Sequence, residues 1–210
     1  MEFDLSQTDA LLSTTRSVRK RLDLERPVPR EVILECLQLA VQAPTGGNAQ
    51  GWRWLVIDDD DTKGKVADLY RTFGKTYLSM YDRDALDNQT NNVLDSADYL
   101  MQILEQVPVL VIPCIKGRVT DPAPVWQAGL YGSIIPAVWS FQLALRTRGL
   151  GSCYTTLHLA QETEAAELLG IPADVTQAAL IPVAYTKGTD FKPAARGPVE
   201  HITYWNHWKS

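Results

Sequence analysis

The segment PAPVWQAGLYGSIIPAVWSFQLAL, from Pro122 to Leu145, contains no charged residue, and the fold depends on it more than on any other stretch. It is long enough to cross a bilayer. Its three prolines, its glutamines and serines, and the tryptophans in its middle argue against a membrane span. They favour a helix that is apolar nearly all round and is buried in a core or a subunit interface. We expect one long helix from about Val125 to Arg148, ended by Gly149.

Three further helices and three strands are predicted around this segment. Pro29 suits a first helical turn, and apolar residues then recur on one face as far as Val41. A second apolar stripe at helical spacing runs from Val93 to Leu104. A short helix is expected over residues 161–169. Short runs of large and branched residues predict strands at 53–57, 107–115 and 180–185.

Prolines interrupt the second strand, at Pro108 and Pro113, and the third, at Pro182. Proline suits strand ends or an edge, so a large regular sheet is not expected. Helices dominate and do not alternate regularly with strands, which indicates an α+β fold with a small, mostly antiparallel or mixed sheet flanked by long helices. The most polar region, 74–96, predicts surface helices and a mobile loop. No repeat or linker divides the chain, so we expect one domain over residues 1–210.

Composition excludes several classes of protein. The 210 residues are 45% hydrophobic and 21% charged, as in an ordinary globular protein. Twenty basic against 25 acidic residues give a net charge of −5, which argues against nucleic-acid binding. Three widely spaced cysteines form no CxxC pair, and no basic run followed by an apolar run opens the chain, so a reducing cytoplasm is expected. The three histidines lack the spacing of a metal site, and His158 is interpreted as a satisfied structural residue.

The first candidate ligand-binding segment is Arg16-Ser17-Val18-Arg19, near the N-terminus. Two arginines at positions i and i+3, with a hydroxyl between them, can hold a phosphate through charge-assisted hydrogen bonds. A solvated basic turn is the alternative interpretation.

The second segment runs from Pro44 to Trp52 and contains Thr45, Asn48 and Gln50. Its two glycines allow a flat ligand to approach the backbone closely, and its amide side chains both donate and accept hydrogen bonds. Such a loop suits the edge of a heteroaromatic ring. It is equally interpretable as a turn-rich connection.

The third segment, Gly149 to Thr156, follows the long apolar helix. Its glycines and small polar residues leave backbone amides available to ring atoms of a ligand. Cys153 has no charged neighbour in sequence, and a buried structural thiol is favoured over a nucleophile. The segment begins like a dinucleotide fingerprint but has Tyr154 at the sixth position and follows a helix, so it is not a Rossmann turn. The chain has neither a Walker A sequence nor a G-x-S-x-G elbow.

Taken in order, these segments resemble the FMN-dependent nitroreductase family over nearly the whole chain. Residues 16–19 are similar to its R-S-[IV]-R element, residues 44–52 to its P-S-x-x-N-x-Q-P-W loop and residues 149–156 to its G-L-G-x-x-[WY] turn. Residues 169–172 match its L-G-I-P, and Arg196 lies in the closing basic segment. Within the family, the likeness is to mycobacterial NAD(P)H nitroreductases. The chain departs from the family at Thr45 and Gly51, and at Ala194 and Ala195, where relatives carry a lysine that Lys192 would have to replace.

The resemblance implies an obligate homodimer with the long helix at the interface and FMN bound between the subunits. Arg16 and Arg196 would hold the FMN phosphate with help from Ser17, and Arg19 would lie at the pyrimidine edge, where negative charge accumulates on reduction. The other implied cofactor contacts are Pro44, Thr45 and Asn48 from the partner subunit, Gln50 of the same loop, and Tyr154, Thr155 and Thr156 near the flavin N5 atom, one of them through a backbone amide.

The implied activity is hydride transfer from a transiently bound NAD(P)H, through flavin N5, to nitroaromatics, quinones or similar electron-poor acceptors in a ping-pong cycle. No protein side chain is expected to be catalytic, and no metal is required. The region 74–96 and the aromatic tail 201–208 would set specificity. Three alternatives stay open: a specialised flavoenzyme on the same fold (dehalogenation, dehydrogenation or flavin breakdown), a non-catalytic flavin-binding module, and an interaction protein without cofactor.

Overall fold

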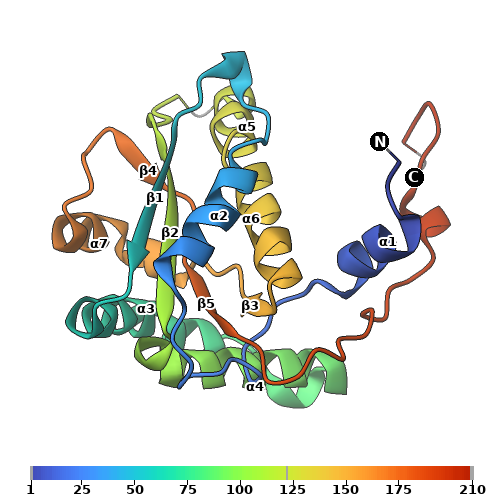
Figure 1. Cartoon of the computed structure of the whole chain (residues 1–210), viewed down its shortest axis with the longest axis horizontal. Coiled ribbons are helices and arrows are strands. Elements are labelled where there is room, and N and C mark those ends of the chain that lie inside the picture. The colour runs from blue at the N-terminus through green and yellow to red at the C-terminus, as the bar shows by residue number, and fades with distance from the viewer. Residues whose placement is uncertain (1, 122, 209–210) are drawn as a thin grey trace.

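A five-stranded antiparallel sheet lies at the centre of the molecule (Figure 1). The computed structural model describes residues 2–121 and 123–208, so Pro122 falls outside the described residues. The strands are β1 (Trp52–Ile57), β2 (Val109–Lys116), β3 (Leu150–Ser152), β4 (Val175–Gln177) and β5 (Ile181–Tyr185). Their order is β1-β2-β5-β3, and β4 also pairs with β2. The predicted α+β class is confirmed, and every strand pair in the described chain is antiparallel.

Pro108 lies directly before β2 and Pro182 is the second residue of β5, so both mark strand ends as expected, whereas Pro113 lies inside β2, an interior strand, and there the expectation was wrong. On one side β2 pairs with β1 at residues 110–115. On its other side it pairs with β5 at residues 109–111 and with β4 at residues 114–116. Pro113 lies at the break between these two ladders, where a missing N–H removes no ladder hydrogen bond. Pro182 precedes the ladder between β5 and β3, which begins at Val183, so its missing N–H removes no hydrogen bond from that ladder.

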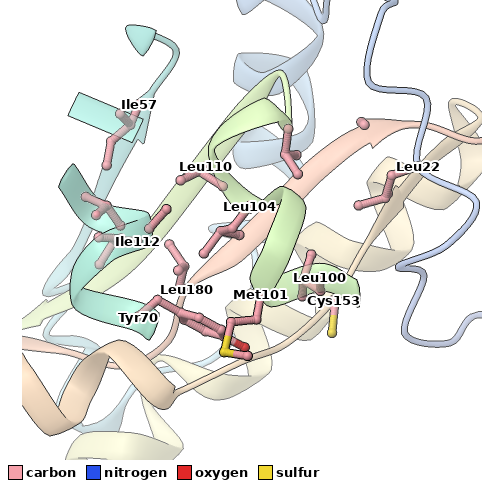
Figure 2. Close-up of a cluster of buried hydrophobic side chains, with 14 of the residues drawn as sticks. Leu22, Ile57, Tyr70, Leu100, Met101, Leu104, Leu110, Ile112, Cys153 and Leu180 are labelled. Atoms are coloured by element: carbon pink, nitrogen blue, oxygen red, sulfur yellow. The ribbon is translucent and has the colours of Figure 1, made fainter. Parts of the chain in front are cut away.

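Helices cover both faces of the sheet, and β2 supplies both cores through the two-residue alternation of a strand. Leu110, Ile112 and Cys114 face a cluster built with α3 (Asp60–Ser79) and α4 (Asn88–Ile103), shown in Figure 2. Val109, Val111 and Ile115 face a second cluster built with α2 (Arg30–Ala40) and α6 (Ile135–Thr147). A continuous apolar run such as 107–115 is therefore a strand buried on both faces.

The predicted single helix over 125–148 is two helices, α5 (Pro124–Gly132) and α6. Pro136 lies in the first turn of α6, where its missing N–H costs nothing, but its ring would clash inside a continuous helix. The chain therefore breaks at Ser133 and Ile134. Residues 124–147 are the one stretch of the described chain long and apolar enough to cross a membrane, and 44% of its most apolar part is buried in the protein. Because α6 packs against α2 and β3, core packing explains the composition of that helix, whereas α5 buries none of its residues.

The remaining helical predictions are largely confirmed. The face predicted from residue 32 onwards buries Ile33, Cys36, Leu37 and Ala40 of α2. The predicted 161–169 helix is α7 (Glu162–Leu169), which ends at Gly170 in the left-handed conformation. In α4 the buried stripe contains Leu94 in place of Val93, which is exposed. The short strands β3 and β4 were not predicted.

The two ends of the chain lie on the same side of the molecule, away from the sheet (Figure 1). Helix α1 (Leu5–Thr14) buries none of its residues. In the C-terminal segment Trp205 and Trp208 are 80% and 82% exposed. Trp126 on α5 and Trp139 on α6 are also exposed, so both regions carry apolar side chains open to solvent.

Candidate functional site

The first and third candidate segments lie against each other. The backbone N–H of Val18 donates to the carbonyl oxygen of Ser152 over 2.9 Å. Gly151 permits this approach, because a Cβ there would lie 3.0 Å from Val18 and 2.7 Å from Thr186 Cγ2. Residues 16–19 and 149–156, predicted separately, therefore form one surface at the end of β3.

Cys153 lies beneath this surface and is fully buried. Burial raises the pKa of its thiol, and the positive charge of neighbouring Arg19 offsets the rise in part. The thiol donates to its neighbouring carbonyl, Tyr154 O, over 3.7 Å. A buried thiol with a raised pKa is a poor nucleophile, which agrees with a structural role.

The three arginines of the predicted site lack carboxylate partners. Arg16 donates to the carbonyl oxygen of Lys192 at 3.3 Å, Arg19 to Ser96 Oγ at 3.2 Å, and Arg196 only to its neighbouring carbonyl, Ala195 O, at 2.9 Å. Within residues 2–121 and 123–208, none of the three forms an ion pair. Six other arginines do, namely Arg21, Arg30, Arg71, Arg83, Arg118 and Arg148. Arg16 and Arg196 are exposed and Arg19 is half-buried, so these donors are available to an anion.

The three predicted ring-lining residues present different groups. Thr155 is buried, and its hydroxyl donates to Tyr70 Oη at 3.0 Å. Tyr154 donates its hydroxyl to the carbonyl oxygen of Ala178 at 3.2 Å, and burial raises its pKa. Thr156 is exposed, and in the described chain its amide donates to no acceptor. Of the three, Thr156 alone has both its amide and its hydroxyl available to a ligand.

The second segment is a tight loop with unusual backbone angles. Asn48 and Gln50 have φ of 54° and 48°, in the left-handed region that non-glycine residues rarely adopt. Thr45 Oγ1 accepts a hydrogen bond from Gln50 N at 3.2 Å, and Asn48 Oδ1 accepts one from Gln50 Nε2 at 2.9 Å. Strain of this kind is typical of ligand-binding loops, and Pro44, Asn48 and Gln50 are exposed.

Ser133, at the break between α5 and α6, holds this loop. Its Oγ accepts from the amide of Gly46 at 3.0 Å and donates to the carbonyl oxygen of Gly129 at 2.7 Å. Its carbonyl oxygen accepts from Trp52 Nε1 at 2.8 Å. The helix break thus positions both ends of the loop.

Within the chain, the second segment lies apart from the other two. Gly46, Ala49 and Gly51 border a cavity of about 610 Å³ between α5 and residues 115–121. No residue of segments 16–19 or 149–156 lines this cavity. The single chain therefore joins two of the three predicted segments.

Sequence reasoning missed three residues that contact the predicted ones: Tyr70 on α3, Ser96 on α4, and Ser133. Of these, only Ser96 could have been suspected from the sequence, because it ends the polar region 74–96. The interpretation of His158 was half right. It is fully buried, but neither ring nitrogen has a hydrogen-bond partner in the described chain, and burial lowers its pKa to about 4.

Three similarities bear on this geometry. An iodotyrosine deiodinase from Thermotoga neapolitana is 27% identical over 177 residues, covering 83% of this chain and 86% of that protein. An NADH dehydrogenase from Thermus thermophilus is 25% identical and covers 98% of this chain and 100% of that protein. A crystal structure of oxidized iodotyrosine deiodinase bound to FMN and 3-iodo-L-tyrosine superposes with a TM-score of 0.72 at 26% identity, covering 95% and 99% of the two chains.

The family model described as "Nitroreductase family" matches residues 12–185, which include the first, second and third segments. With this match and the antiparallel sheet between two helical layers, the chain belongs to the nitroreductase family.

Proposed function

We propose that this protein is an FMN-dependent oxidoreductase that takes hydride from NAD(P)H and passes it to nitroaromatics, quinones or similar electron-poor acceptors. The observation that carries the proposal is that Arg16 and Arg19, in the segment that pairs with the end of β3, have no carboxylate partner in the described chain, and the same holds for Arg196 in the C-terminal segment. The similarity to an NADH dehydrogenase over nearly the whole chain supports the electron donor, and the FMN-bound neighbour supports the cofactor.

The residues present fit FMN. Arg16 and Arg196 would bind the phosphate, with the exposed Ser17 adding a hydrogen bond, since a dianion satisfies guanidinium groups that no carboxylate engages. Arg19 would face the pyrimidine edge. The free amide of Thr156 would donate to the ring, while Tyr154 and Thr155 fix the loop through their buried hydroxyl bonds. FMN itself supplies hydride acceptance and donation, so the chain's task is to bind and orient it.

We further propose that the protein is a homodimer of one-domain subunits, located in the cytoplasm, with the site shared between protomers. Pro44, Thr45, Asn48 and Gln50 would come from the partner, because their own protomer's arginine segments lie elsewhere. The exposed apolar side chains of α5 and α6 provide the surface for such an interface: Val125, Trp126, Tyr131, Ile135 and Trp139.

A second candidate is reductive dehalogenation of a halogenated aromatic on the same cofactor. The observation that favours it is the 27% identity with an iodotyrosine deiodinase over most of both chains. Turnover of 3-iodotyrosine under dithionite, compared with NAD(P)H-driven reduction of a quinone, separates the two candidates. A protein that binds FMN but is reduced by neither NADH nor NADPH would instead be a flavin-binding module.

The first test is an FMN titration of the purified protein, followed by anaerobic addition of NADPH and then NADH. We expect a flavin band near ~450 nm that bleaches and then returns with a quinone. Arg16→Ala and Arg196→Ala should each weaken FMN binding about tenfold, the worth of a charge-assisted hydrogen bond. Arg26→Ala is the matched control, because Arg26 forms no ion pair with any described residue and lies over the Tyr185 ring. A wild-type protein that takes up no FMN would overturn the proposal.

A further inference from the structure

Arg19 is held by an uncharged group. Its Nη1 donates to Ser96 Oγ of α4 at 3.2 Å. This partner does not neutralise its charge. Asp95, the carboxylate next to Ser96, pairs with Arg83 at 2.9 Å. Arg19 is therefore a half-buried cation whose direction is fixed while its charge stays available.

Ser96 is oriented to accept. Its own hydroxyl hydrogen goes to the carbonyl oxygen of Val93 at 2.8 Å, one turn earlier in α4. The oxygen lone pairs are thereby left toward Arg19. The Ser96 hydroxyl hydrogen cannot turn toward Arg19 without losing its hydrogen bond to the Val93 carbonyl oxygen.

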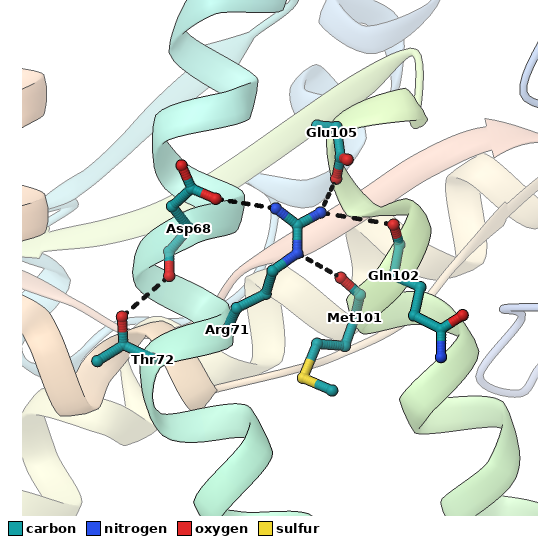
Figure 3. A network of polar contacts seen from close by, with 6 residues as sticks. All are labelled: Asp68, Arg71, Thr72, Met101, Gln102 and Glu105. Atoms are coloured by element: carbon teal, nitrogen blue, oxygen red, sulfur yellow. Dashed lines mark hydrogen bonds and ion pairs between the residues drawn. The ribbon is translucent and has the colours of Figure 1, made fainter.

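Helix α4 gives Ser96 a rigid support. Leu94, Leu100 and Met101 are buried on either side of it in sequence. At the C-terminal end, Arg71 of α3 donates to the carbonyl oxygens of Met101 and Gln102 and pairs with Glu105, as Figure 3 shows. These contacts fix α4 against α3, so the position of Ser96 is set by the core.

We propose that Ser96 is a positioning residue that aims Arg19 at the bound cofactor, so that the polar region 74–96 acts on flavin affinity and potential through this one hydrogen bond. The inference rests on the proposed function. Without Ser96, the guanidinium gains rotational freedom, and the cation is less well placed for the charge that accumulates on the flavin when it is reduced.

The test compares Ser96→Ala and Ser96→Thr, with FMN dissociation constants and midpoint potentials as readouts. Alanine is well tolerated in a helix, so folding should be retained. We expect Ser96→Ala to raise the FMN dissociation constant about three- to tenfold. The preference of the Ser96→Ala variant for reduced over oxidised FMN should fall by up to about tenfold. This corresponds to a midpoint potential of the bound flavin about 30 mV lower for a two-electron couple. Ser96→Thr keeps the hydroxyl and should restore both values.

Two controls make the result specific. Thr147→Ala removes a hydroxyl with the same pair of contacts, a donation to Ala144 O at 2.8 Å and an acceptance from Arg148 at 3.3 Å, at an arginine that already has Glu35 as partner. It should leave FMN affinity and potential unchanged. In an Arg19→Ala background, Ser96→Ala should have no further effect, because Ser96 acts only through Arg19.

Two results would overturn the inference while leaving the proposed function intact: wild type and Ser96→Ala with the same affinity and potential, or a Ser96→Ala effect that persists in Arg19→Ala. Failure of the wild-type protein to bind FMN would instead remove the proposed function itself.

Discussion

The amide of Val18 and the carbonyl oxygen of Ser152 are joined by a hydrogen bond of 2.9 Å, which fixes the arginine segment to the end of β3. Two stretches more than a hundred residues apart in the chain thereby form one surface. The arginines on this surface depend on a close backbone approach, and Gly151 is the residue that allows it.

Gly151→Ala should therefore disturb both stability and cofactor binding. The new Cβ would lie 2.7 Å from Thr186 Cγ2 and 3.0 Å from Val18, so the backbone must shift. We expect a loss of about 1–3 kcal/mol in the free energy of unfolding, typical of overpacking, and weaker FMN binding. Gly64→Ala in α3 is the control, because its Cβ meets nothing within 4 Å and alanine favours a helix. Urea unfolding and FMN titration measure both effects; equal stability of the two variants would contradict the argument.

Ser133→Ala should loosen the loop that contains Asn48 and Gln50. The variant loses the acceptor of the Gly46 amide while leaving the Trp52 bond to the backbone. We expect a destabilisation of about 1 kcal/mol, faster amide hydrogen exchange at residues 45–51 and a several-fold weaker FMN affinity. Ser140→Ala, in the same apolar segment, should change none of these. Unchanged exchange at 45–51 would show that the loop is held by other contacts.

Much of the fold followed from local patterns, because α2, α7 and the longer strands carry an apolar periodicity or run of their own. The helix break at Ser133 did not follow from apolar periodicity, since a segment apolar on all sides has no polar face to mark where one helix ends; its sequence signal was Pro136, which suits the first turn of a second helix. Strands β3 and β4 have three residues each and are defined by their partners in the sheet, which no local pattern reveals.

The candidate site was predictable where its residues are adjacent in sequence, as in 16–19 and 149–156. The contacts of Arg19 with Ser96, and of Thr155 with Tyr70, span 77 and 85 residues. They arise from the packing of α3 and α4 against the end of β3. Whether a residue is buried, as Thr155 is, or exposed, as Thr156 is, also depends on tertiary packing. The sequence therefore could not separate the roles of these two neighbours.

Arg71→Ala should destabilise the protein by detaching the end of α4. In the network of Figure 3, Arg71 donates to two carbonyl oxygens at the end of α4 and pairs with Asp68 and Glu105. Helix C-terminal carbonyls are otherwise unsatisfied, so we expect a loss of about 1–3 kcal/mol. Lys65→Ala removes an exposed i,i+4 pair with Asp61 and should cost less than about 0.5 kcal/mol. Equal urea midpoints for the two variants would contradict this assignment.

His158 should make the protein's stability depend on pH between about 6.5 and 4. Burial lowers its folded-state pKa from 6.5 to about 4, so the unfolded chain binds the proton more readily in this interval. The stability that neutral His158 contributes is therefore present above pH 6.5, decreases as the pH falls, and is lost near pH 4; the total is about 3 kcal/mol. His158→Leu removes the titrating group and two unpartnered ring nitrogens. Its urea midpoint at pH 7 should equal or exceed that of wild type, and its decrease between pH 7 and pH 4.5 should be smaller. Parallel decreases in the two proteins would show that carboxylates, and not His158, cause the acid sensitivity.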